Sequence, residues 1–204
     1  MSEVGAAEDA STALGPRDPG PGVVATTDPV EFDRFAKGLR TATLAVDGTI
    51  RLGIPRWVAE LHRGAFPTDE SHVEAPGTFE YLVAAAAGCL LDHYGNAVEL
   101  LGLQATDGTL TSSAYGEVTE ESDRCLMVSA IRIAYRLELP PARELTDRDV
   151  SRLERALDTH TRRCPIARTL RGRTAVVASL TVTRDGAELL SLGPCTSNLQ
   201  APGA

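Results

Sequence analysis

Residues 79–101 constrain the fold more than any other segment, because their pattern predicts one long helix with a buried first half. The run from Tyr81 to Leu91 is apolar on nearly all sides of such a helix, which is typical of a helix inside a protein core. The second half becomes amphipathic. Thr78 is the expected N-cap, and Gly102 is the expected C-terminal stop. With 11 residues, the apolar run is too short to cross a bilayer.

Strand and turn signals surround this helix. Two Asp-Gly pairs, which tolerate the positive φ of tight turns, separate β-rich runs. A Thr-x-x-Asp capping box begins a second helix, and a Cys-Pro pair begins a short third one. The expected further helices are residues 147–162 and 165–170, and the expected strands are residues 41–46, 49–54, 57–66, 110–119, 125–139, 174–183 and 187–192. This order predicts an α+β fold with antiparallel sheets.

A single domain is predicted between two tails. Residues 1–28 are rich in Ala, Gly, Pro, Ser and Asp without apolar periodicity, which is typical of a disordered arm. Residues 193–204 have a similar composition and are expected to form a flexible tail. The domain is therefore expected at residues 29–192, a length that suffices for one hydrophobic core.

Charge and cysteine content argue against several classes of protein. A net charge of -8 without any block of Lys or Arg is unsuited to binding nucleic acid. The four cysteines lie far apart and form no CxxC motif, unlike those of zinc ribbons, thioredoxins and secreted disulfide scaffolds. Neither a signal peptide nor a membrane span is recognisable, so the expected location is the cytoplasm, away from membranes.

Two cysteines lie in settings that bear on thiol chemistry. Cys164 precedes a proline and is the expected N-cap of the short helix, where free N–H groups and the helix dipole favour a thiolate. Arg162, Arg163 and Arg168 add positive charge nearby, although a half-buried structural cysteine is the open alternative. Cys89 lies mid-helix among alanines, where the local sequence favours a small core residue that needs a cationic partner to react.

A metal site is a second interpretation of the same segments. Cys89 and His93 are four residues apart on one helix, and so are His160 and Cys164 on the other, so each pair shares a helix face. Together they could form a Cys2His2 zinc site. Zinc ligands usually have shorter paired spacings, and Pro165 distorts the second pair, so no bound metal is predicted. The alternative for His160 is a histidine that the helix dipole favours near a C-terminus.

The two cysteine segments together resemble two motifs of the OsmC/Ohr family. Residues 80–89 are similar to the family's helix motif, in which an acidic and several small apolar residues precede the first active cysteine. Residues 163–170 resemble its second motif, a Cys-Pro at the start of a short helix. The order of elements agrees over residues 29–192. The resemblance implies an OsmC-like fold, with antiparallel sheets around a long central helix, in an intertwined homodimer with its active sites at the interface.

The resemblance also implies a function as a thiol-dependent peroxidase. Cys89 would be the peroxidatic thiolate that attacks an organic hydroperoxide and becomes a sulfenic acid, and Cys164 would resolve it to a disulfide. A dithiol, such as that of a lipoylated protein, would reduce the disulfide, and no metal or organic cofactor would be needed. Glu80 occupies an acidic position of the family. The arginine that stabilises the thiolate would come from the N-terminal strands, where the candidates are Arg51, Arg56 and Arg63.

Two positions depart from the family pattern. Ohr-type members have a glutamate ten residues before the first cysteine, where this chain has Phe79, and a serine is common where this chain has Ala167. These departures keep two alternatives open. One is a non-peroxidase member of the family that binds a small apolar molecule at the dimer interface. The other is a different thiol-dependent step in small-molecule metabolism.

Overall fold

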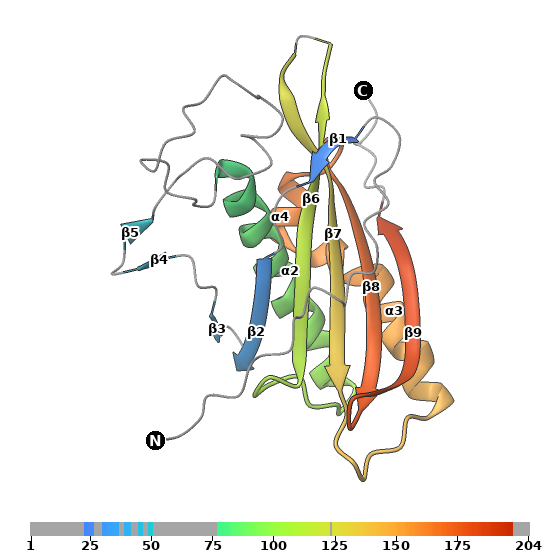
Figure 1. Ribbon diagram of the computed structural model, residues 1–204. Coiled ribbons are helices and arrows are strands. Elements are labelled where there is room, and N and C mark those ends of the chain that lie inside the picture. Colours follow the sequence, from blue (N-terminus) through green and yellow to red (C-terminus); the bar gives the residue numbers. More distant parts are fainter. Residues whose placement is uncertain are drawn as a thin grey trace.

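The structure is a computed structural model that describes residues 77–122 and 124–197 and, before them, the backbone of five strands. These short strands are β1 (Val23–Thr26), β2 (Val30–Ala36), β3 (Leu39–Thr41), β4 (Ala45–Val46) and β5 (Thr49–Ile50). The later chain forms α2 (Thr78–Leu100), β6 (Leu110–Glu120), β7 (Leu126–Glu138), α3 (Asp147–Arg163), α4 (Pro165–Thr169), β8 (Ala175–Arg184) and β9 (Ala187–Ser197). Strands and helices together make the fold α+β, as predicted (Figure 1).

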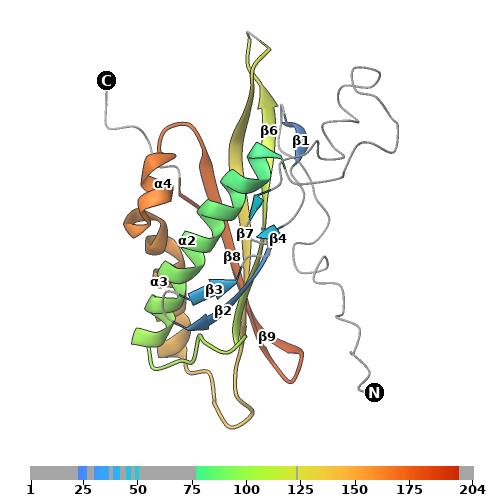
Figure 2. The same cartoon turned by 90° about the vertical axis from the view of Figure 1, so that its left-hand side faces the viewer.

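The helices cover one face of a single large sheet (Figure 2). The strands of this sheet follow the order β3-β2-β6-β7-β8-β9, and β1 pairs with β6 as well. Most neighbouring strands are antiparallel, but β7 and β8 run parallel, with Ala130 opposite Ala175. The prediction of purely antiparallel sheets is therefore wrong at this pair. Its cause is the crossover through α3 and α4, which returns the chain to the edge of the sheet in the same direction.

The predicted helices and hairpins lie close to their expected places. The helix predicted at residues 79–101 is α2, although its N-cap is Gly77 and Thr78 is already helical. Gly102 has a φ of 74° and ends the helix as expected. Strands β4 and β5 pair as the predicted hairpin, with Ala45 opposite Ile50. The strand predicted at residues 57–66 lies outside the described residues.

Both ends of the predicted domain differ from the structure. Strand β1 lies inside the segment predicted as a disordered arm, and its Val23 is opposite Thr119 of β6. Strand β9 continues to Ser197, past the expected end of the domain at residue 192. Strand β1 is stabilised by backbone pairing with β6, which is remote in the sequence. Strand β9 is stabilised by pairing with β8 along its whole length, as far as Ser197 opposite Val176. Composition does not reveal such pairing.

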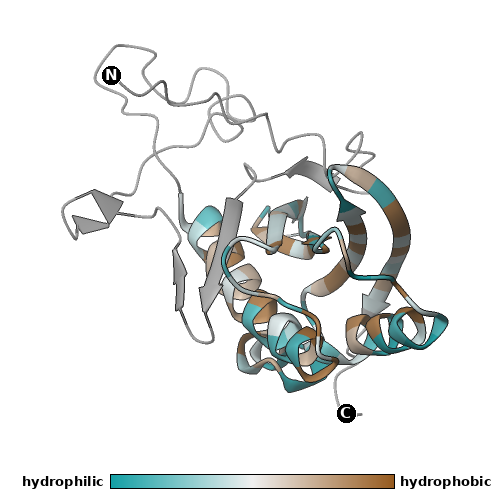
Figure 3. Ribbon diagram, turned by 90° about the horizontal axis from the view of Figure 1, so that it is seen from below, coloured by the Kyte–Doolittle hydropathy of each residue, from teal (hydrophilic) through white to brown (hydrophobic). Residues whose placement is uncertain are grey.

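The hydrophobic core lies between the helices and the sheet. Hydrophobic and hydrophilic positions alternate around the helices, as expected when one side of each helix is buried (Figure 3). Three aromatic side chains with polar atoms pack together within this core. Tyr94 of α2 and Tyr135 of β7 stack with their ring centroids 4.6 Å apart, and the ring of His160 of α3 contacts both edge-on. Large side chains that are fully buried around them include Leu90, Leu91, Ile131, Ile133, Leu153, Leu157 and Leu180. In the part of the chain that the structure describes, no helix has the length and apolar character needed to cross a membrane.

The start of α3 depends on the capping box that the sequence predicts. The Thr146 hydroxyl accepts a hydrogen bond from the Asp149 N–H at 3.2 Å, and the Asp149 carboxylate accepts one from the Thr146 N–H at 3.1 Å. The variant Thr146→Ala loses the first bond and should lower the free energy of unfolding by about 1 kcal/mol in urea denaturation. Thr159→Ala, on the exposed side of the same helix, is the matched control and should change it little. Equal losses in both variants would show that the cap is not responsible.

Candidate functional site

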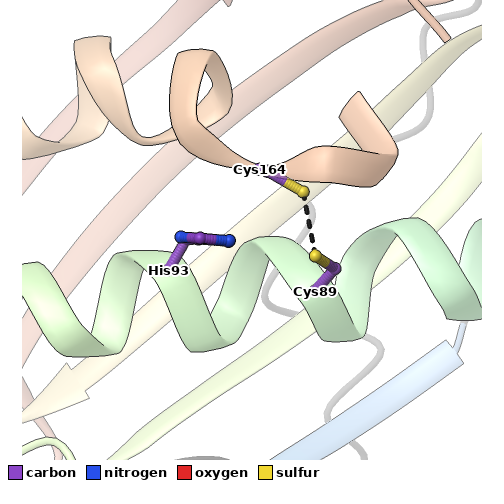
Figure 4. Close-up of side chains that lie close together, drawn as sticks. All are labelled: Cys89, His93 and Cys164. Atoms are coloured by element: carbon purple, nitrogen blue, oxygen red, sulfur yellow. Dashed lines mark hydrogen bonds between the residues drawn. The ribbon is translucent and has the colours of Figure 1, made fainter. Parts of the chain in front are cut away.

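The two cysteines that the sequence singles out face each other across the helical layer (Figure 4). Cys89 projects from the middle of α2, and Cys164 lies at the junction of α3 and α4. Their Sγ atoms are 3.1 Å apart, with the Cys164 thiol placed to donate a hydrogen bond to the Cys89 sulfur. Both are free thiols. A disulfide bond is about 2.05 Å long, so a sulfur movement of about 1 Å would close it.

Cys164 is held by two helices at once. Its extended backbone ends α3, where its N–H donates to the His160 carbonyl at 3.3 Å, and Pro165 then begins α4. Its Sγ accepts a hydrogen bond from the Ala167 N–H at 3.4 Å, which confirms the predicted N-cap. The Cys-Pro sequence explains this geometry, because the residue before a proline avoids the helical conformation and the proline itself suits the first helical position.

Burial reverses the expected ionisation of Cys164. The sequence favours a thiolate at this helix start, but the side chain is fully buried. The loss of hydration raises the pKa of the Cys164 thiol to about 12, and the hydrogen bond from the Ala167 N–H offsets only part of that rise. The three flanking arginines are exposed: Arg162, Arg163 and Arg168. Cys164 is therefore a neutral thiol, able to act as a hydrogen-bond donor.

Cys89 is the more accessible sulfur of the pair. It is half-buried, whereas its helix neighbours Gly88 and Leu90 are buried. A small solute therefore meets the Cys89 sulfur before that of Cys164. The Cys89 sulfur is also the acceptor of the hydrogen bond from the Cys164 thiol.

His93 joins the two cysteines in a cluster of three. It lies one helical turn after Cys89 on the same side of α2, and one nitrogen of its ring and the two sulfurs all lie within 4.8 Å of one another. His160 does not complete a four-residue set. Its Nδ1 donates to the Leu157 carbonyl at 2.7 Å, and its Nε2 accepts from the Tyr135 hydroxyl at 3.0 Å. The Cys2His2 arrangement considered from the sequence is not formed, because both nitrogens of His160 are engaged in the core.

A cavity of about 320 Å³ begins beside His93 and extends between α2 and α3. Its wall on the α2 side includes Leu100 and Leu101, which are apolar. Its wall on the α3 side carries three cationic residues, Arg152, Arg155 and Arg163. Sequence reasoning missed this wall. Its signal was present, because these arginines recur at intervals of three and eight residues and so share one side of the helix.

The remaining predicted site residues are not brought to the cysteine pair. Glu80 is buried at the start of α2, where its carboxylate accepts a hydrogen bond from the Gly77 N–H at 2.8 Å. It lies nine residues before Cys89, about 13 Å away along the helix axis and on the opposite side. Cys125 is exposed, and Cys195 lies in β9. The three candidate arginines lie outside the described residues: Arg51, Arg56 and Arg63.

Comparisons with known proteins match most of this region. The family model for OsmC-like protein matches residues 69–179. Among solved structures, an OsmC-like protein from Mycoplasma pneumoniae is 16% identical, with a TM-score of 0.43 over 56% of this chain and 77% of that one. The organic hydroperoxide resistance protein OhrB of Bacillus subtilis is 16% identical, with a TM-score of 0.37 over 53% and 72%. The Legionella pneumophila OsmC, an organic hydroperoxide resistance protein, is 12% identical, with a TM-score of 0.34 over 53% and 70%. No curated protein matches the sequence.

Proposed function

Because this chain belongs to the family of OsmC-like proteins, whose model covers more than half of it, we propose that it is a thiol-dependent peroxidase for organic hydroperoxides. The observation that carries the proposal is the 3.1 Å separation of the Cys89 and Cys164 sulfurs. Two free thiols at this distance can pass from thiol to disulfide with little movement of the backbone. Cys89 is the nucleophile, and Cys164 is the resolving thiol.

The reaction has two steps at these sulfurs. The Cys89 thiolate attacks the terminal oxygen of the hydroperoxide, the O–O bond breaks, and the leaving alkoxide takes a proton and departs as an alcohol. The sulfur of Cys164 then attacks the resulting sulfenic acid, an S–S bond forms, and the hydroxyl group leaves as water. Hydroperoxide and two thiols thus become alcohol, water and a disulfide. An external dithiol, such as that of a lipoylated protein, reduces the disulfide.

The different surroundings of the two sulfurs support this assignment of roles. Cys89 is the sulfur that solutes reach first, and it accepts a hydrogen bond from its partner. Cys164 is buried with a pKa raised to about 12, so it stays protonated until the first step has occurred. A nucleophile must be a thiolate, and burial disfavours that form at Cys164.

The cavity supports an organic peroxide as the substrate. It adjoins the cysteine pair at His93 and is lined partly by Leu100, Leu101 and Ala156. An apolar group on the peroxide can fill such a space and lose its contact with water, which hydrogen peroxide cannot do. Further parts of the proposal rest on the family resemblance: a cytoplasmic homodimer and a thiolate-stabilising arginine chosen from Arg51, Arg56 and Arg63.

The proposal is tested by the fate of the four cysteines. Adding one equivalent of an organic hydroperoxide to the reduced protein should consume two thiols per chain and join Cys89 to Cys164. Peptide mapping without reduction identifies the bond, and alkylation counts the remaining thiols. Cys125 and Cys195 are internal controls and should stay alkylatable. Oxidation spread equally over all four residues would contradict a dedicated pair.

The cavity also favours one alternative, in which the protein binds a small apolar molecule without turning over a peroxide. The two functions differ in their need for sulfur. If the protein only binds such a molecule, Cys89→Ser should still bind it. The folded wild-type protein should then consume hydroperoxide no faster than the same protein after unfolding, which has the same number of thiols.

A further inference from the structure

We propose that the reduced protein binds one Zn²⁺ ion through Cys89, His93 and Cys164, and that joining the two cysteines releases it. The inference concerns equilibrium binding, so it does not depend on the peroxidase activity. It rests on the cluster of two sulfurs and one imidazole nitrogen that lie within 4.8 Å of one another.

The three donor atoms lie near the separations that a zinc ion requires. In a tetrahedral site with Zn–S bonds of about 2.3 Å and Zn–N bonds of about 2.0–2.1 Å, neighbouring donor atoms are about 3.5–3.8 Å apart. The two sulfurs are 3.1 Å apart, and no pair of donor atoms in the cluster exceeds 4.8 Å. Moving the sulfurs apart by about 0.7 Å and bringing the imidazole nitrogen closer by at most about 1.3 Å would therefore give the required distances.

The ligands are held by rigid elements. Cys89 and His93 lie one turn apart on the 23-residue helix α2, so their relative position is fixed by the helix. Cys164 is held between α3 and α4. The Ala167 N–H that faces its sulfur at 3.4 Å would donate a hydrogen bond to a zinc-bound thiolate. Such a bond orients the ligand and keeps part of its charge satisfied.

The chemistry of the donors selects the metal. Two thiolates and one imidazole suit Zn²⁺, whereas Mg²⁺ and Ca²⁺ prefer oxygen ligands. The two thiolates balance the charge of the ion, and zinc displaces both thiol protons on binding. Cys89 and His93 are only half-buried, so a water molecule can reach the fourth position. Three protein ligands with one open position distinguish such a site from a closed structural zinc site.

The same sulfurs cannot bind zinc after they have formed a disulfide. A hydroperoxide that oxidises the zinc-bound pair takes up two protons and leaves as alcohol and water, while an S–S bond replaces two Zn–S bonds and Zn²⁺ departs. Zinc binding and oxidation therefore exclude each other. Zinc should protect the reduced pair, and oxidation should release the ion.

The test uses a chain with Cys125→Ser and Cys195→Ser, which leaves Cys89 and Cys164 as its two cysteines. The reduced, metal-free protein is titrated with Zn²⁺ against a chromogenic chelator, and with Co²⁺ while its absorption is recorded. We expect one Zn²⁺ per chain and, with Co²⁺, a thiolate-to-metal charge-transfer band. Oxidation by a small-molecule disulfide, which needs no peroxidase activity, should abolish binding.

The role of His93 is tested in the same background. His93→Ala should weaken zinc binding by at least about 100-fold. Loss of a residue that only hydrogen-bonds a metal ligand typically costs up to about 100-fold, and loss of a ligand itself should cost no less. Asn96→Ala, which alters the next turn of the same cavity wall, is the matched control and should change the affinity by less than about 2-fold. Circular dichroism verifies that both variants are folded.

Three results would overturn the proposal: no stoichiometric zinc in the reduced protein, unchanged affinity in His93→Ala, or unchanged affinity after the cysteines are joined. Hydroperoxide turnover is measured separately in buffer with a chelator. A protein that turns over peroxide but ignores zinc would refute this inference alone, and a protein that binds zinc but leaves peroxide intact would refute only the proposed function.

Discussion

Replacing Cys89 by serine should reduce hydroperoxide turnover to the uncatalysed rate, a loss of at least about 1,000-fold, as is typical when an enzyme loses its nucleophile. The serine hydroxyl is close in size but is not ionised at neutral pH, so it cannot attack the O–O bond. Turnover is measured as the loss of an organic hydroperoxide in the presence of a dithiol reductant. Normal turnover by Cys89→Ser would rule out Cys89 as the nucleophile.

Replacing Cys164 by serine should instead stop the reaction after its first step. The variant should consume one equivalent of hydroperoxide and leave a sulfenic acid on Cys89, which a carbon nucleophile that is specific for sulfenic acids can trap. Cys125→Ser changes an exposed cysteine and is the matched control, which should keep full turnover. If no sulfenic acid could be trapped in Cys164→Ser, Cys164 would have to be the nucleophile and Cys89 the resolving thiol.

The second large effect is a loss of stability in acid that originates at His160. Burial lowers the pKa of this imidazole to about 4, whereas the same group in the unfolded chain has a pKa of about 6.5. Between these two values the unfolded chain binds one more proton than the folded protein. The contribution of neutral His160 to stability is therefore complete above pH 6.5 and is lost as the pH falls toward 4. The total loss is about 3 kcal/mol, at 1.36 kcal/mol for each pH unit.

The measurement is the free energy of unfolding in urea at pH 7 and at pH 4.5, with a chelator present. His160→Gln cannot titrate, so its stability should fall less over this interval, although it starts lower because the bonds to Tyr135 and Leu157 are disturbed. His93→Gln removes a charge that helps to lower the pKa of His160, so its acid loss should lie between that of wild type and that of His160→Gln. The same acid loss in wild type and His160→Gln would refute the role of His160.

Local signals allowed the helical part of the site to be predicted. The apolar run around Cys89 gives the position of α2, and the Cys-Pro pair gives the junction at Cys164, because both depend on preferences of a few adjacent residues. That the two sulfurs meet followed from the family resemblance and not from either segment alone. The contact needs the packing of α2 against α4, which no short stretch of sequence encodes.

The errors share one physical origin. The parallel pairing of β7 with β8 and the pairing of β1 with β6 join segments that are remote in the sequence. The ionisation of Cys164 was judged from its place at a helix start, which favours a thiolate, but the loss of water around it has the larger effect. Burial of a side chain is set by the whole fold, so sequence neighbours predict it poorly.

Cys164 is both the C-cap of α3 and the N-cap of α4, so this one residue connects the two helices. A sulfur on a flexible loop could move toward its partner without disturbing anything else. Here the moving atom belongs to the joint between two helices, and one of them forms a wall of the cavity. Each oxidation and reduction therefore displaces the junction of α3 and α4, so that forming or breaking the S–S bond also strains the packing of these two helices.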